Sequence, residues 1–212
     1  RGLHGGGNLR AAVFGINDGL VSNASLILGI AGAGPDPHMV LLTGVAGMCA
    51  GAFAMATGEY VSVRSQRELF EYQIGLEREE LAQYPEAEAQ ELALIYAAKG
   101  LPPEEALKLA TQIVADPEHA LDTLAREELG LNPDELGSPW GAAISSFVAF
   151  AAGALLPLAP FMLMSGPRTL PVAIGVTAVA LFAVGALLSL SAGRGALRSR
   201  ARMLALGGLA GA

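Results

Sequence analysis

Five glutamates in the middle of the chain have the residue type and the spacing of a carboxylate cation site. Glu77 and Glu80 are three residues apart, as are Glu88 and Glu91, and residues with this separation share one face of an α-helix. Glu128 lies near the end of a later acidic segment. Carboxylate oxygens suit Mg²⁺, Ca²⁺, Mn²⁺ and Fe²⁺. The plainer interpretation is a solvated acidic surface, and spacing alone does not decide between the two.

Other kinds of metal chemistry find little support in the composition. One cysteine and three histidines exclude a disulfide framework, a thiolate zinc site and a histidine-rich site. The Glu-x-x-His motif of di-iron oxidation bundles is missing from the sequence. The glutamates therefore favour reversible cation binding over oxidation chemistry.

Asp18 is a charged residue inside an otherwise apolar segment. A charged aspartate at mid-membrane costs about 2.5–3.5 kcal/mol on insertion scales, so it usually faces a bundle interior, a partner or a water path. A structural hydrogen bond to a neighbouring helix is the alternative. Small residues four positions apart surround Asp18 and recur in the second apolar segment, and this pattern allows helices to approach closely: Gly15, Gly19, Gly47 and Gly51.

Sulfur and one more acid lie in the second apolar segment. Met48, Cys49 and Met55 are more simply explained as packing residues than as ligands. Glu59 follows Met55 by one helical turn, where it is either a gate or an interfacial residue.

Four apolar segments are long enough to cross a membrane. The chain has 212 residues, of which 52% are hydrophobic and only 16% charged. A helix of about 20 residues spans the hydrocarbon core. The predicted spans are residues 11–33, 39–63, 140–164 and 170–192. A fifth apolar stretch begins near Met203, and we expect it to be incomplete at Ala212.

Positive charge predicts the orientation of these spans. Arginines precede the first span and fill the segment between the fourth and the expected fifth, whereas the loop at 34–38 has none. Because cytoplasmic loops are enriched in Lys and Arg, the amino terminus and residues 64–138 are predicted to be cytoplasmic.

Residues 64–138 form a separate acidic segment. Residues 64–136 contain 17 of the 20 acids and 6 of the 13 bases, a net charge of −11, which excludes a nucleic-acid partner. Prolines and glycines divide the segment into three or four helices, and the second span is expected to continue into the first of them. The prediction is an all-α polytopic membrane protein, with spans one and two in 1–63, a cytoplasmic helical domain in 64–138, and spans three to five in 139–212.

The motifs together resemble the vacuolar iron transporter family. They are GINDGLVS in the first span, AMATGEYVSVRSQRE leaving the second, the two ExxE pairs, REELGL, and PLAP in the third span. They cover essentially the whole chain in the expected order. The resemblance implies a homodimer of five-helix subunits that moves Fe²⁺, and often Mn²⁺, out of the cytosol in exchange for protons. It implies a transporter and not an enzyme, with the metal ions as cargo and no prosthetic group.

The resemblance also assigns residues. Asp18 matches the membrane aspartate of the family, and Met55 matches the methionine beside the ion path. The cytoplasmic metal ligands of the family match Glu77, Glu80, Glu88, Glu91 and Glu128. Two departures stand out. Gly47 occupies the place of a membrane glutamate found in some members, whose role Glu59 could share, and Leu124-Ala125 replace paired methionines, which favours an all-oxygen site and Mn²⁺.

Two other functions are compatible with the sequence. A membrane-anchored divalent-metal buffer or sensor would need the acidic segment but not Asp18. A transporter of organic cations is disfavoured because the spans supply few aromatic residues for a cation cage. In a bacterium the protein would lie in the cell membrane, and in a eukaryote in a vacuole-like membrane.

Overall fold

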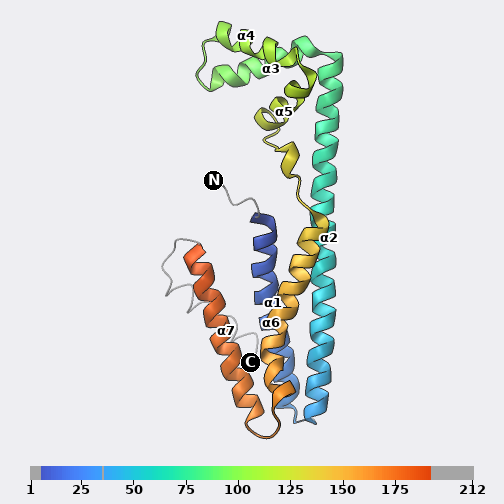
Figure 1. The fold of residues 1–212 in the computed structure, drawn as a ribbon, viewed down its shortest axis with the longest axis vertical. Helices are drawn as coiled ribbons and strands as arrows, with labels where there is room; N and C mark the ends of the chain where they lie inside the picture. The colour runs from blue at the N-terminus through green and yellow to red at the C-terminus, as the bar shows by residue number, and fades with distance from the viewer. Residues whose placement is uncertain (1–5, 35, 192–212) are drawn as a thin grey trace. The chain divides into compact units, whose positions relative to one another are not determined.

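The chain is all α-helical in the part that the structure describes. The computed structural model describes residues 6–34 and 36–191, which form seven α-helices and one short 3-10 helix (Figure 1). The chain divides into two compact units, residues 62–138 and the two segments that flank them. We call 62–138 the acidic unit, and 1–61 with 139–212 the membrane unit. The expected fifth span and the arginines beyond residue 192 lie outside the described residues.

The membrane unit contains four apolar helices. They are α1 (Gly6–Gly32), the first half of α2 (Pro37–Gln83), α6 (Pro139–Leu163) and α7 (Thr169–Ser191). Each is long and apolar enough to cross a bilayer. The protein is therefore a multi-pass membrane protein, as predicted.

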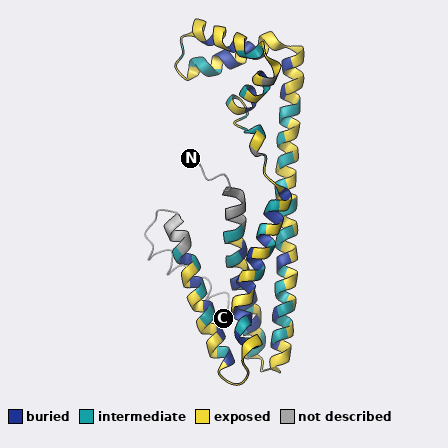
Figure 2. Ribbon diagram, viewed as in Figure 1, coloured by how far each residue is buried: buried dark blue, intermediate teal, exposed yellow. Residues whose placement is uncertain are grey.

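Helices α1 and α6 pack unusually closely because glycines line their contact (Figure 1). A Cβ atom added to Gly19 would lie 2.1 Å from the carbonyl oxygen of Phe150, and one added to Gly153 would lie 2.2 Å from that of Ile16. Small residues let the backbones approach to this distance. Buried residues accordingly follow the length of α6 (Figure 2).

Helix α2 packs on the same pair through a second row of glycines. Gly44 faces Ile27 and Leu158, and Gly51 faces the Phe150 ring. Phe53 meets Phe147 edge to face, with ring centroids 5.1 Å apart. The small-residue patterns predicted to allow close helix approach therefore do so in α1 and α2.

The acidic unit is built from helices that begin at prolines. The second half of α2 ends at Gln83, and the unit continues with α3 (Pro85–Ala98), α4 (Pro103–Val114), α5 (Pro117–Glu127) and η1 (Pro133–Glu135). Proline suits the first helical position, because an N–H group at that position would have no acceptor within the helix and its absence costs nothing. The predicted continuation of the second span is confirmed, since α2 runs unbroken for 47 residues. The core of the unit comprises Leu81, Leu92, Ala93, Ala106, Ala110, Ala120 and Leu124.

Candidate metal site

Three glutamates from three helices meet in the acidic unit. Glu77 lies on α2, Glu88 on α3, and Glu128 caps the end of α5. One carboxylate oxygen of each lies within 4.8 Å of the others. Glu77 is only 3% exposed and Glu88 only 6%, whereas Glu128 is exposed. Buried carboxylates at this separation are unfavourable unless a cation or a proton lies between them.

The apolar core places these three side chains. Each glutamate is four residues from a leucine of the core on the same helix: Glu77 with Leu81, Glu88 with Leu92, and Glu128 with Leu124. Residues four apart share a helix face, so a helix that buries its leucine turns its glutamate toward the same centre. The cluster is therefore the polar continuation of the core.

Two local structures fix the backbone at the cluster. Tyr84 ends α2, donating its N–H to the Glu80 carbonyl, and accepts N–H groups of the first turn of α3, so Glu77 and Glu88 flank a tight turn. At the other side Gly130 adopts φ +65°, and Leu131 N–H donates to the Ala125 carbonyl at 2.8 Å. This left-handed cap ends α5 immediately after Glu128.

The electrostatics of the cluster disfavour full ionisation. Burial, followed by the charges of Glu128 and Glu88, raises the pKa of Glu77 to about 8. Burial also raises the pKa of Glu88 and of Glu128. Nearby like charges disfavour the ionised form, whereas a bound divalent cation favours it.

No basic side chain neutralises the cluster in residues 36–191. The ion pairs of the acidic unit lie elsewhere, such as Arg64 with Glu68 and Arg67 with Glu71. None involves a glutamate of the cluster. Oε1 of Glu77 is buried and accepts no hydrogen bond from a described residue. A cation would give this oxygen a partner, so the donor set fits a divalent ion.

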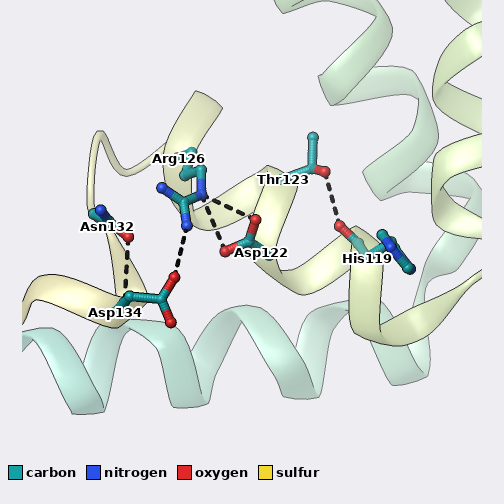
Figure 3. Close-up of polar contacts among 6 residues, drawn as sticks. All are labelled: His119, Asp122, Thr123, Arg126, Asn132 and Asp134. Atoms are coloured by element: carbon teal, nitrogen blue, oxygen red, sulfur yellow. Dashed lines mark hydrogen bonds and ion pairs between the residues drawn. The ribbon is translucent and has the colours of Figure 1, made fainter. Parts of the chain in front are cut away.

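Arg126, two residues before Glu128, forms its ion pairs outside the cluster. Arg126 Nε donates to both carboxylate oxygens of Asp122, at 2.9 and 3.0 Å, and its Nη2 donates to Asp134 Oδ2 at 3.2 Å (Figure 3). Asn132 accepts the N–H of Asp134 in the same view. This network fastens the segment after α5 to the helix itself, and so keeps the α5 end in place without adding positive charge to the site.

The two remaining predicted ligands lie around the three. Glu80 and Glu91 are exposed. Their charges nevertheless raise the pKa of Glu88 and Glu128, so they are close enough to add to the negative potential. Leu124 and Ala125 are fully buried in the acidic unit.

The predicted membrane residues are distributed over two helices. Asp18 is on α1 and is exposed on the surface of the subunit. Met55 on α2 is half-buried and packs beside Phe150 and Ala154. Glu59, one turn further, is also half-buried. An exposed carboxylate in an apolar span needs water, a cation or another protein surface beside it.

One buried polar residue of the spans escaped the sequence analysis. Asn23 is 2% exposed, and its Nδ2 donates to the Ala154 carbonyl at 2.8 Å. Its Oδ1 accepts no hydrogen bond from the residues that the structure describes and faces Gly47, where an added Cβ would lie 2.9 Å away. A Cβ at position 47 would also meet the Leu26 side chain at 2.5 Å, so the ends of the Asn23 and Leu26 side chains would have to shift to admit a larger residue. The signal for Asn23 was an amide in an apolar span.

Comparison with known proteins decides the family. A family model described as VIT family matches residues 9–212. The chain belongs to the VIT family. It is 31% identical to vacuolar iron transporter 1 of Arabidopsis thaliana over 176 residues, covering 83% of this chain and 70% of the plant protein. It is 30% identical to vacuolar iron transporter 1 of Oryza sativa subsp. japonica over 205 residues, covering 96% and 81%.

A VIT family relative outside plants is more similar over a shorter stretch. The vacuolar iron transporter of Acanthamoeba castellanii is 39% identical over 152 residues, which is 72% of this chain and 54% of that protein. The resemblance predicted from the motifs is thus confirmed.

Proposed function

We propose that this protein exports Fe²⁺ and/or Mn²⁺ from the cytosol across a membrane in exchange for protons. Three observations support the proposal. The VIT family relatives are named iron transporters. Four helices are suited to crossing a bilayer. The carboxylates of Glu77, Glu88 and Glu128 meet in a cluster without a basic partner in the described chain, which supports a divalent cation as the cargo. The relatives carry the most weight for transport itself.

In this proposal the acidic unit is a cytoplasmic cation collector. Glu77, Glu88 and Glu128 bind the ion directly. Glu80 and Glu91 at the rim raise the local cation concentration through their charge. All five ligands offer oxygen, which suits Mn²⁺ and Fe²⁺ better than soft ions.

Asp18 is the central residue of the proposed membrane path. Its exposed carboxylate lies on an apolar helix, and a second copy of the chain would cover it, which motivates a homodimer with two α1 helices side by side. The cation would bind the Asp18 carboxylates and the Met55 sulfurs, and Glu59 would lie at the cytoplasmic entry. Protonation of Asp18 from outside would then release the ion.

A metal buffer or sensor without transport is the second candidate. The cluster in the acidic unit serves that function equally well, and the spans would be an anchor. Asp18 separates the two candidates, because an anchor has no use for a charged residue in its first span.

Uptake by proteoliposomes tests the proposal. The purified protein is reconstituted, and entry of Mn²⁺ and Fe²⁺ is followed with and without a pH gradient. We expect entry that follows the gradient and is lost in Asp18→Asn, while the variant stays folded and dimeric by size-exclusion chromatography. Ser22→Ala, one turn away on the same face, is the matched control. Binding of Mn²⁺ without any entry would favour the buffer, and normal entry in Asp18→Asn would contradict the proposed path.

A further inference from the structure

Two neighbouring glutamates at the end of α5 have different partners. Glu127 forms an ion pair with Lys99, which follows the last residue of α3. Glu128, the next residue, has its carboxylate in the cluster with Glu77 and Glu88. The sequence Glu127-Glu128 by itself gives no reason for one to bind a cation and not the other.

Lys99 is held in place by several interactions besides Glu127. Its backbone N–H donates to the Ile95 carbonyl and caps α3. Its ammonium lies 5.9 Å from the centroid of the Tyr96 ring. A cation is also favourable at the carboxyl end of a helix, because the helix dipole is negative there. The position of Lys99 is therefore set by α3, and the Glu127 side chain is held where it can pair with this lysine.

Glu127 is not part of the carboxylate cluster, whose oxygens within 4.8 Å of one another belong to Glu77, Glu88 and Glu128. Glu127 is nevertheless half-buried, with a side chain 27% exposed, so it is not simply directed into solvent. Its ion pair is what separates it from its neighbour.

We propose that Lys99 is a positioning residue that selects Glu128, and not Glu127, as the α5 ligand of the cation. By holding Glu127 at the end of α3, Lys99 fixes the rotation of the last turn of α5. Successive helical residues differ by about 100° in direction, so fixing Glu127 directs Glu128 elsewhere, toward Glu77 and Glu88. The inference rests on the proposed cation binding at the cluster.

A set of glutamine variants tests this selection. The full-length protein in detergent is titrated with Mn²⁺, and free Mn²⁺ is read from its electron paramagnetic resonance signal. Glu127→Gln and Glu128→Gln are each measured with Lys99 present and in the Lys99→Ala background. Lys108→Ala, which removes an exposed lysine of α4, is the control for the loss of one positive charge. Thermal unfolding of each variant confirms that it is folded.

With Lys99 present, we expect Glu128→Gln to weaken Mn²⁺ binding by about tenfold or more. We expect Glu127→Gln and Lys99→Ala each to weaken Mn²⁺ binding only about twofold to fivefold, because each removes a partly exposed ion pair and neither removes a ligand. In the Lys99→Ala background the two glutamine changes should have similar effects, since Glu127 is then free to bind. Lys99→Arg keeps the positive charge and should restore the original order.

These measurements distinguish failure of the Lys99 selection from failure of the cation site itself. Unchanged dominance of Glu128 over Glu127 in the Lys99→Ala background would overturn the selection while leaving the cluster as a cation site. Mn²⁺ binding that is insensitive to Glu77→Gln and Glu88→Gln in the wild-type chain would overturn both. If Lys99→Ala does not fold, Lys99→Met, which keeps the length of the side chain and removes its charge, takes its place: continued dominance of Glu128 over Glu127 in that background contradicts the proposal.

Discussion

Glu77 on α2 and Glu88 on α3 form a buried pair of carboxyl groups. Burial, and then the charges of Glu128 and Glu88, raise the pKa of Glu77, and burial also raises the pKa of Glu88. With a pKa of about 8, Glu77 is protonated at neutral pH in the metal-free protein. A divalent cation that binds here must displace this proton.

Mn²⁺ binding should therefore strengthen as pH rises toward 8. Below the pKa of Glu77, each pH unit should weaken binding by up to about tenfold, because one proton competes with the metal. Above pH 8 this dependence should level off. Calorimetric titration between pH 6 and 9 measures it, with Glu79→Gln, an exposed neighbour, as the control. Glu77→Gln should bind more weakly and lose the dependence near pH 8. A wild-type affinity that does not change with pH would contradict proton displacement.

The metal-free protein should show the opposite trend in stability. In the unfolded chain Glu77 ionises near the ordinary glutamate pKa of 4.5, whereas in the folded chain its pKa is about 8. The free energy of unfolding of the acidic unit should therefore fall as pH rises from about 4.5 to 8. Glu77→Gln should remove this loss and stabilise the metal-free protein by about 1–3 kcal/mol at pH 8, with no gain at pH 4.5. Thermal unfolding in a chelator measures both. Equal destabilisation by the variant at both pH values would exclude the explanation.

The helices were predictable because their boundaries are local. Pro85, Pro103 and Pro117 each begin a helix, and an apolar run needs no tertiary information to be recognised as a span. The unbroken α2 followed from the lack of any break signal between the second span and Gln83. These features depend on single segments of the chain, so periodicity and proline placement suffice.

The inward direction of the acids was only partly predictable. Spacing gave two ExxE pairs but not which member of each faces the core. A leucine four residues away does not decide, because Glu80 also has one in Leu76. The burial of Leu81 and Leu92 in the core is what turns Glu77 and Glu88 inward. The partners of Lys99 and Asn23 depend on how helices meet across the fold. Such contacts leave no local pattern, so only the structure identifies them.

The glycines between α1 and α6 should be intolerant of a single methyl group. Gly19→Ala would place a Cβ atom 2.1 Å from the Phe150 carbonyl oxygen, which belongs to backbone and cannot rotate away. We expect a loss of about 1–3 kcal/mol or more, seen as a lower melting temperature in detergent. Gly29→Ala, also on α1, meets nothing within 4 Å and should be neutral or stabilising. Equal melting temperatures for the two variants would show that the helices can separate at no cost.

A comparison of Met48 and Met55 on α2 tests whether a methionine sulfur binds the ion or only packs. Met48 and Met55 both pack, half-buried, on the cluster of Ala52, Phe150 and Ala154. Replacement by Leu preserves volume and costs less than about 1.5 kcal/mol, so either variant should fold. If the Met55 sulfur binds the ion, Met55→Leu should reduce transport, and more for Fe²⁺ than for the harder Mn²⁺.

Met48→Leu is the matched control for this loss, because it removes a sulfur from the same apolar cluster seven residues away. It should leave uptake of both metals near the wild-type rate in proteoliposomes. Equal rates for the two variants would assign Met55 to packing alone. Asp18 and Glu59 would then be the remaining membrane ligands of the proposed path, and only oxygen atoms would bind the transported ion there. In that case Met55→Leu would leave the ratio of Fe²⁺ to Mn²⁺ uptake unchanged, which the same assay measures.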